Sequence, residues 1–283
     1  MRYFPLTKDR FEHEFGIRAI PPSESIVEAT DHYDQQIQLR RDALARDADY
    51  YFQSTEDRKV AQREARDLVI SSAPFLSGAR NGRTGEPIDL HHRFALLEIA
   101  RHVQEDLAIM SGDADRGFPL IAGAIIFPSG WCIGDKLGKS VLAIHRDVPE
   151  FESELNEQTQ QLLARLKLER PVWRMNWGVR PSGQLDQSPM HGVMLKQRGD
   201  LITAANAGSE CYFRVEHQTL SRLPGGDILF TIHTHQTPLN VLSQQQRRDL
   251  LGVLETCPPE TLRYKGIWPM RHPVTDYLRE SVR

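Results

Sequence analysis

The chain has 283 residues, enough for one large domain or two small ones with a substantial core. Its 40% hydrophobic and 26% charged residues are typical of a globular protein and unlike a disordered chain. A net charge of -3 gives no reason to expect nucleic acid or a membrane surface as partner, and no apolar run approaches the roughly 20 residues that span a bilayer. The charged first residues do not resemble a signal peptide, so we expect a cytoplasmic protein.

The first part of the chain is predicted to be mainly helical. Residues 25–52 are polar with spaced apolar positions and have no internal glycine or proline, which favours a helix. Residues 90–110 place apolar side chains near helical spacing, which predicts a second helix with one buried face. The segment between them, 71–89, is rich in Gly, Ser, Pro and Asn and is predicted to be a loop. We therefore describe residues 1–112 as a helical N-terminal extension.

The central part, residues 113–240, changes to strand patterns. The apolar, β-branched run 119–127 predicts a buried strand, and 140–145 predicts a second one. A helix is expected over 149–169, because Pro149 suits a helix start and acidic residues follow it. Segments 172–179, 211–218 and 228–235 alternate apolar and polar residues, which is typical of strands with two different faces.

The alternation divides the last strands into faces, and short connections suggest how they pair. On one face of 172–179 lie Trp173, Met175, Trp177 and Val179, with Arg174 and Asn176 on the other. The LPGGD link, residues 223–227, predicts a hairpin between the last two strands. Ser243 and Gln246 resemble a capping box at the start of a helix over 243–256, so residues 241–283 are predicted to be C-terminal helices. The whole is predicted to be a single α+β domain with a mostly antiparallel sheet.

His145 is the first residue that could carry chemistry. It ends the predicted strand 140–145, just before a turn, where a side chain can be exposed yet fixed in place. A neutral imidazole is a common axial ligand of haem iron. By itself, a single histidine at a strand end is more often a structural residue.

Several segments, in order, give that histidine a context. They are FPSGW, DKLGKS and IHRDVPEF between residues 127 and 151, together with QEDLAIM (104–110), RMNWGV (174–179), FRVEHQTLSRLP (213–224) and ILFTIHTHQTPL (228–239). In this set the chain resembles the haem-dependent oxidative N-demethylase family, formerly a family of unknown function. The resemblance covers residues 104 to 239, and the N-terminal hundred residues match only loosely.

The resemblance implies a PAS-like sheet, over residues 113–240, that is enlarged by helices and holds haem b. It also implies a monooxygenase-type enzyme that uses dioxygen and electrons to demethylate a small secondary amine such as dimethylamine. Oxidation of the N-methyl carbon would give a carbinolamine, which collapses to the demethylated amine and formaldehyde. The sequence has no flavin, nicotinamide or iron–sulfur signature, so the electrons would come from NADPH through a separate flavin/iron–sulfur reductase.

On this basis His145 is expected to be the axial iron ligand. The haem propionates need cations, and arginine can grip a carboxylate with two hydrogen bonds, so Arg174 is the first choice. Lys136 and Lys139 come next. Asn176, Trp177 and His233 complete the predicted contacts with the cofactor.

The substrate side is expected to use a carboxylate or an aromatic face, because either can hold a small alkylammonium ion. Glu216 with Tyr212 could supply both, and Trp177 could supply the ring. His235 is included as a catalytic candidate. At this position, family members often have an aromatic residue, so the chain departs from the pattern there.

Two other functions remain open. One is a PAS-like sensor or carrier that binds haem or another ligand without turnover. The other is a non-haem metalloenzyme, because alternate residues of a strand point the same way and His233 and His235 could chelate one ion. Glu216 on the neighbouring strand would complete a set of two histidines and one carboxylate.

Overall fold

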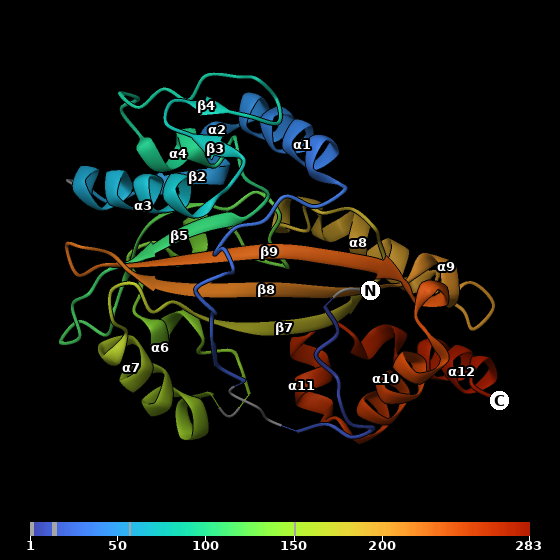
Figure 1. Cartoon of the computed structure of the whole chain (residues 1–283). Helices are drawn as coiled ribbons and strands as arrows, with labels where there is room; N and C mark the ends of the chain where they lie inside the picture. The colour runs from blue at the N-terminus through green and yellow to red at the C-terminus, as the bar shows by residue number, and fades with distance from the viewer. Residues whose placement is uncertain (1–2, 13–15, 57, 150) are drawn as a thin grey trace.

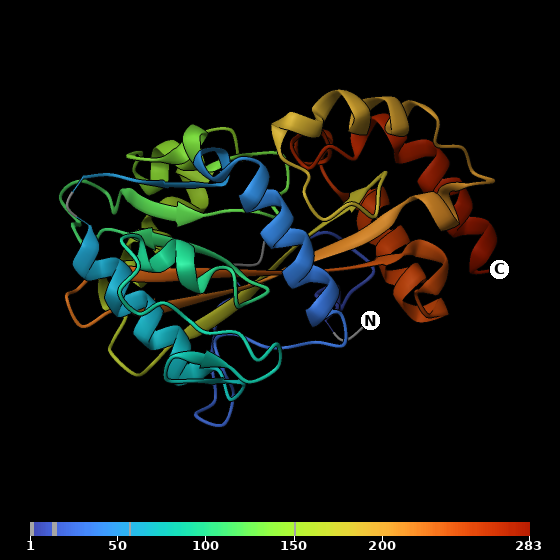
Figure 2. The same cartoon turned by 90° about the horizontal axis from the view of Figure 1, so that it is seen from above.

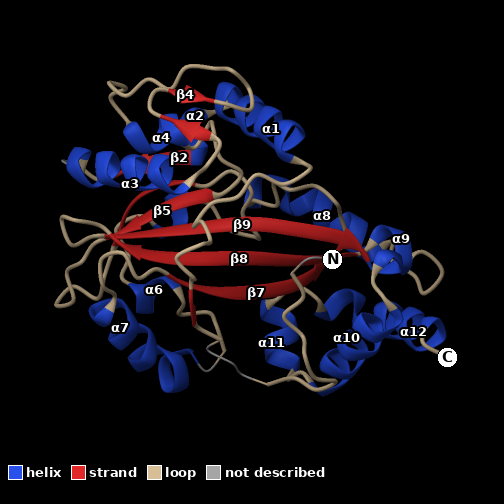
Figure 3. Cartoon of the chain, viewed as in Figure 1, coloured by secondary structure: helices blue, strands red, loops and turns tan. Residues whose placement is uncertain are grey.

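The computed structural model describes residues 3–12, 16–56, 58–149 and 151–283, and its centre is a seven-stranded sheet. The strand order is β1-β7-β8-β9-β5-β6-β2, and every neighbouring pair is antiparallel. Helices lie on both sides of the sheet (Figures 1 and 3). The predicted mixture of helices with a large antiparallel sheet is confirmed.

Three long strands form the middle of the sheet, and they are the three segments with alternating sequence patterns. They are β7 (Val172–Arg180), β8 (Tyr212–Arg222) and β9 (Ile228–Pro238). The turn between β8 and β9 contains Gly226, whose φ of 94° lies in the region that suits glycine. The predicted hairpin is therefore confirmed.

The N-terminal part is less helical than predicted, because it contributes strands to the main sheet. These are β1 (Arg18–Ala19), β2 (Phe52–Ser54) and β5 (Asp106–Met110). The helix expected over 90–110 was wrong: only α4 (Ala95–Ile99) is helical, and β5 pairs with both β9 and β6 (Leu120–Ala124). All five residues of β5 are buried on both faces, so its sequence lacks the alternation that would have marked it as a strand.

The N-terminal helices cover one face of the sheet (Figures 1 and 2). They are α1 (Tyr33–Arg46), α2 (Ala48–Tyr51), α3 (Lys59–Ser72) and α4, with a small hairpin of β3 (Leu76–Ser77) and β4 (Arg80–Asn81) beside them. The helix expected over 25–52 thus begins only at Tyr33. Arg40 of α1 forms a buried ion pair of 2.8 Å with Asp106, which also accepts hydrogen bonds from the backbone of Ile126 and Phe127.

The opposite face carries short helices from the centre of the chain. They are α5 (Ile133–Lys136), α6 (Val141–Ile144), a π-helical turn (Phe151–Leu155) and α7 (Asn156–Arg165). The strand predicted over 140–145 was wrong, because Ser140 caps α6 by accepting a hydrogen bond from the backbone of Ala143. The helix predicted over 149–169 is confirmed in its central part.

The remaining helices gather at one end of the sheet (Figure 1). Between β7 and β8 lie α8 (Gly192–Asp200) and α9 (Ala207–Glu210), and after β9 come α10 (Gln244–Thr256), α11 (Pro259–Tyr264) and α12 (Arg271–Ser281). The predicted capping box of Ser243 and Gln246 is present at the start of α10. Within the described parts of the chain, we find no helix with the length and apolar character needed to cross a bilayer.

The register of β7, β8 and β9 divides their residues between two faces. Asn176, Glu216 and Thr234 are aligned across the strands, and so are Met175, His217 and His233. Because adjacent residues of a strand point to opposite faces, Glu216 and His233 lie on different sides of the sheet.

Candidate functional site

A cavity of about 440 Å³ lies beneath the middle of the sheet, on the face of Glu216. This volume is in the usual range of sites for small molecules and cofactors. One wall is formed by β7, β8 and β9, and the others by α6, α7 and the end of α11. Apolar residues line much of it, namely Met110, Leu120, Val141, Ile144, Phe151, Leu162, Leu163, Leu220, Phe230 and Ile232.

His145 lies in the cavity wall directly after α6, with one ring nitrogen fixed. Its Nδ1–H donates to the carbonyl oxygen of Val141 at 2.8 Å, and its ring stacks on Phe151 with centroids 4.4 Å apart. Burial lowers the pKa of His145, and the positive charges of Arg174 and Lys136 act in the same direction. The neutral ring therefore keeps a lone pair on Nε2, which has no hydrogen-bond partner among the described residues.

Positive side chains converge on the same cavity. Arg174 and Arg180 extend from β7, Lys136 from the end of α5, and Lys265 from the residue after α11. Burial lowers the pKa of Arg174 and Arg180, and it lowers the pKa of Lys265 to about 8. The Nε of Arg174 is buried without a hydrogen-bond partner within the described chain. Such an unpaired donor costs free energy unless an acceptor outside the chain satisfies it.

Both lysines of the cavity donate hydrogen bonds to backbone carbonyls. Lys136 Nζ donates to the carbonyl of Ile144 at 2.8 Å, and so ties α5 to the end of α6 beside His145. Lys265 Nζ donates to the carbonyl of Trp177 at 2.8 Å and to Asn176 Oδ1 at 3.3 Å, and it also lies over the Trp177 ring. Lys265 therefore fixes β7 where this strand borders the cavity.

Glu216 is the buried carboxylate of the cavity. Its Oε2 accepts hydrogen bonds from Gln218 Nε2 at 2.9 Å and from Asn176 Nδ2 at 3.3 Å. The surrounding Arg174, Arg180 and Lys265 offset part of the cost of burying its charge. This arrangement holds a carboxylate at the floor of a site that otherwise carries positive charge.

The cavity brings together six of the ten residues predicted from sequence. These are Lys136, His145, Arg174, Asn176, Trp177 and Glu216. Among the described residues, the lining does not include Lys139, Tyr212, His233 or His235. Lys139 is exposed, and the Tyr212 ring lies against Gly183, where an added Cβ would come within 2.6 Å of it.

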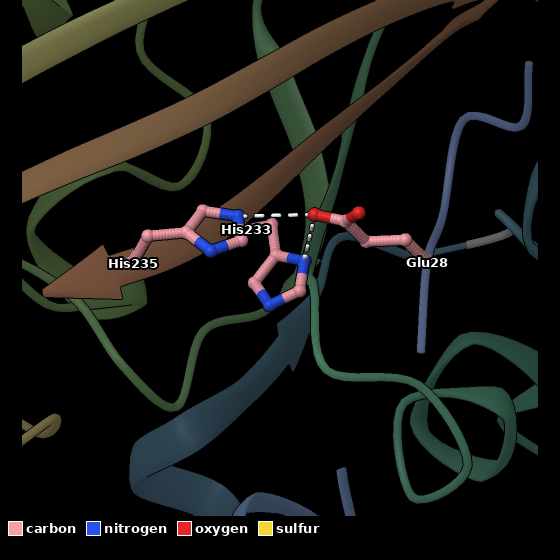
Figure 4. A group of neighbouring side chains, drawn as sticks. All are labelled: Glu28, His233 and His235. Carbon is pink, nitrogen blue, oxygen red and sulfur yellow. Dashed lines mark ion pairs between the residues drawn. The ribbon is translucent and has the colours of Figure 1, made fainter. Parts of the chain in front are cut away.

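His233 and His235 lie on the other face of the sheet, near Glu28 (Figure 4). The carboxylate next to this pair is therefore Glu28 rather than Glu216, which corrects the predicted non-haem set. Glu216 pairs with Thr234 in register, so its side chain points away from both histidines.

Sequence reasoning missed several lining residues. Arg180 and Arg214 lie on the polar faces of β7 and β8, so the alternation that selected Arg174 and Glu216 could have found them. Arg214 is fully buried, and it donates to Ser129 Oγ at 2.9 Å and to the carbonyl of Phe127 at 2.6 Å. It thereby fixes the start of the segment that leads to His145. Lys265 had no local signal, because only the packing of α11 brings it to the cavity.

Comparison with protein families gives an independent finding. A family model described as haem-dependent oxidative N-demethylase, alpha subunit-like, matches residues 16–275. The match includes every residue named above as part of the cavity. It also extends over the N-terminal region that the sequence motifs matched only loosely.

Proposed function

The chain belongs to the haem-dependent oxidative N-demethylase, alpha subunit-like family, and we propose that it binds haem b in the cavity and demethylates a small secondary amine. The observation that carries this proposal is the convergence on one cavity of His145, with Nε2 free, and the incompletely paired guanidinium of Arg174. The first suits iron and the second suits a propionate. We also propose that the sheet is PAS-like, as the family resemblance implies.

The residues of the cavity fit haem in their chemistry. His145 would be the axial ligand, because the bond from its Nδ1–H to Val141 fixes the ring and leaves Nε2 as the ligand atom. Arg174, with Arg180 and Lys265 nearby, would hold the propionates. The apolar lining excludes water from the macrocycle. When bound, haem would supply the activation of dioxygen that oxidises an N-methyl carbon and releases it as formaldehyde.

Glu216 is the proposed anchor of the substrate. A secondary amine is protonated near neutral pH, and a buried carboxylate can hold the ammonium while apolar walls surround its methyl groups. The bonds from Gln218 and Asn176 orient Glu216 and leave its Oε1 available to the ligand. The ring of Trp177 is not placed for the predicted contact with this charge, because its side chain has the opposite parity to Asn176, stacks on Phe213 and lies against Lys265 Nζ.

The family description names an alpha subunit, which implies that such proteins work with other components. We propose that electrons reach this chain from NADPH through a separate flavin/iron–sulfur reductase. Dioxygen and the amine would be its other partners.

The test begins with the purified chain reconstituted with haem. We expect a Soret band and, with a reductase and NADPH, formaldehyde from dimethylamine in an amount that matches NADPH consumed. A haem-loaded protein that releases no formaldehyde from any small methylamine would support the sensor alternative instead. A chain that takes up no haem would overturn the proposal as a whole.

A further inference from the structure

A second group of ligand-type side chains lies on the opposite face of the sheet from the cavity (Figure 4). His233 and His235 extend from β9, and Glu28 extends from the segment before α1. Their ligand atoms all lie within 4.8 Å of one another. Glu28 Oε1 is 3.1 Å from His235 Nε2 and 3.4 Å from His233 Nδ1.

Glu28 contacts both histidines at ion-pair distance. His233 is 1% exposed, yet both of its ring nitrogens are buried without a hydrogen-bond partner in the described chain. The Nε2 of His235 is likewise buried without a hydrogen-bond partner in the described chain. Buried polar atoms are nearly always satisfied, so three orphaned nitrogens in one cluster indicate a missing ligand. One ring nitrogen of each histidine, Nδ1 of His233 and Nε2 of His235, converges with the Glu28 oxygen as the ligand atoms around a metal ion do.

The surroundings hold the three side chains in place. The Glu28 backbone N–H donates to Glu105 Oε1 at 2.9 Å, and the Tyr3 hydroxyl donates to Glu28 Oε2 at 3.3 Å. Glu105 Oε1 also lies 3.0 Å from His233 Nδ1, so it is placed to join the ligand set. The charge of two carboxylates beside two imidazoles favours a cation.

We propose that Glu28, His233 and His235 bind one divalent transition-metal ion, separate from the haem. Two imidazoles and one carboxylate are the ligand set that Zn²⁺ and non-haem Fe²⁺ take, whereas Mg²⁺ and Ca²⁺ prefer oxygen ligands. The ion would join the segment before α1 to the middle of β9. It would lie across the sheet from the cavity, on side chains that the cavity does not use, so its existence does not depend on the proposed function.

The test uses Zn²⁺ as the probe on the purified full chain. After a chelator wash, metal analysis and titration against a zinc indicator should give one Zn²⁺ per chain. Glu28→Gln and His235→Gln should each weaken binding by more than the ~10–100-fold that follows loss of a mere supporting partner. Both residues are partly exposed, so we expect these variants to fold, and an unchanged circular dichroism spectrum would show that they do.

His217→Gln is the matched control. His217 is on the same face of the sheet and its ring stacks on Tyr3 with centroids 4.7 Å apart, but it is outside the ligand set. The His217→Gln variant should bind Zn²⁺ with the affinity of the wild type. The proposal is overturned if the wild-type chain binds no Zn²⁺, or if both ligand variants bind it with wild-type affinity. If the wild-type chain binds Zn²⁺ and the ligand variants do not, metal analysis of freshly purified protein identifies the ion bound during expression.

Discussion

The two faces of the central sheet use the same strands for different chemistry. The cavity face carries Arg174 and Glu216 among hydrogen-bonded and charged partners, beside a large empty volume. The opposite face carries His233 and His235, packed closely against Glu28. A large cavity suits an organic cofactor and its substrate, whereas a tight cluster of ligand atoms suits a single ion.

The comparison shows that neighbours in sequence need not belong to one site. Glu216 and His217 are adjacent in β8, yet each faces a different group of partners. The partners come from elsewhere: α6 and α11 complete the cavity, and the segment around Glu28 completes the cluster. The strands supply some side chains of each site, and the elements packed against each face supply the others.

The largest effect is expected when one histidine is removed from each site, which tests whether the two sites are separate. His145→Ala should lower haem affinity by about 100-fold, or about 3 kcal/mol, because it removes the proposed axial ligand. His233→Gln, on the opposite face, should leave haem affinity unchanged. Haem titration followed at the Soret band measures both, with circular dichroism as the check of folding. Equal losses in the two variants would contradict the assignment of separate sites.

A second experiment asks whether the carboxylate of the cavity serves the amine or the cofactor. Glu216→Gln keeps the shape and removes the charge, so KM for the amine should rise about 10-fold, or about 1.4 kcal/mol, with haem content unchanged. Glu210→Gln, an exposed position just before β8, is the control and should have no effect. If Glu216→Gln loses haem instead, the carboxylate supports the cofactor and not the substrate.

The smallest expected effect concerns the buried cation at the cavity edge. Burial lowers the pKa of Lys265 to about 8 from an ordinary value of 10.5, so between these pH values the unfolded chain binds a proton that the folded chain does not. The contribution of Lys265 to stability is therefore least favourable below pH 8, and it improves as pH rises from 8 to 10.5.

The measurement compares Lys265→Met with wild type by denaturant unfolding of the haem-free chain. The free energy of unfolding of wild type should rise relative to the variant by about 1 kcal/mol across this pH range, less than the roughly 3 kcal/mol of a fully desolvated ammonium, because Lys265 is only half-buried and solvent screens part of its charge. Lys139→Met, which removes an exposed lysine, should show no such trend. A pH-independent difference for Lys265→Met would mean that its ammonium remains solvated.

Much of the sheet could be predicted because β7, β8 and β9 each have one polar and one apolar face. Strand β5 could not, because both of its faces are buried and its sequence is uniformly apolar after Asp106. The segment before His145 has β-branched residues typical of a strand, but Ser140 caps it as a helix. Local propensity was overridden there by a cap and by packing.

The candidate sites show the same limit. Arg174, Asn176 and Glu216 were predicted together and do lie together, because they have the same parity on paired strands. Tyr212 has the same parity as Glu216 but is the first residue of β8 and lies beyond the cavity. Alternation tells which face a side chain takes and not how far along the strand a site extends. Glu28 and Lys265 have no pattern of their own, and only the tertiary structure brings them to the two faces.

The hairpin of β8 and β9 also makes the chain unusually sensitive to changes of length. Deleting one residue within β8 would shift every later side chain of that strand to the other side, and place an imidazole where the carboxylate now stands. Substitutions can alter one face and leave the other intact, but a single-residue insertion or deletion would damage both at once. We therefore expect changes of length to be tolerated in the turn that follows Arg222 and not in the strands on either side of it.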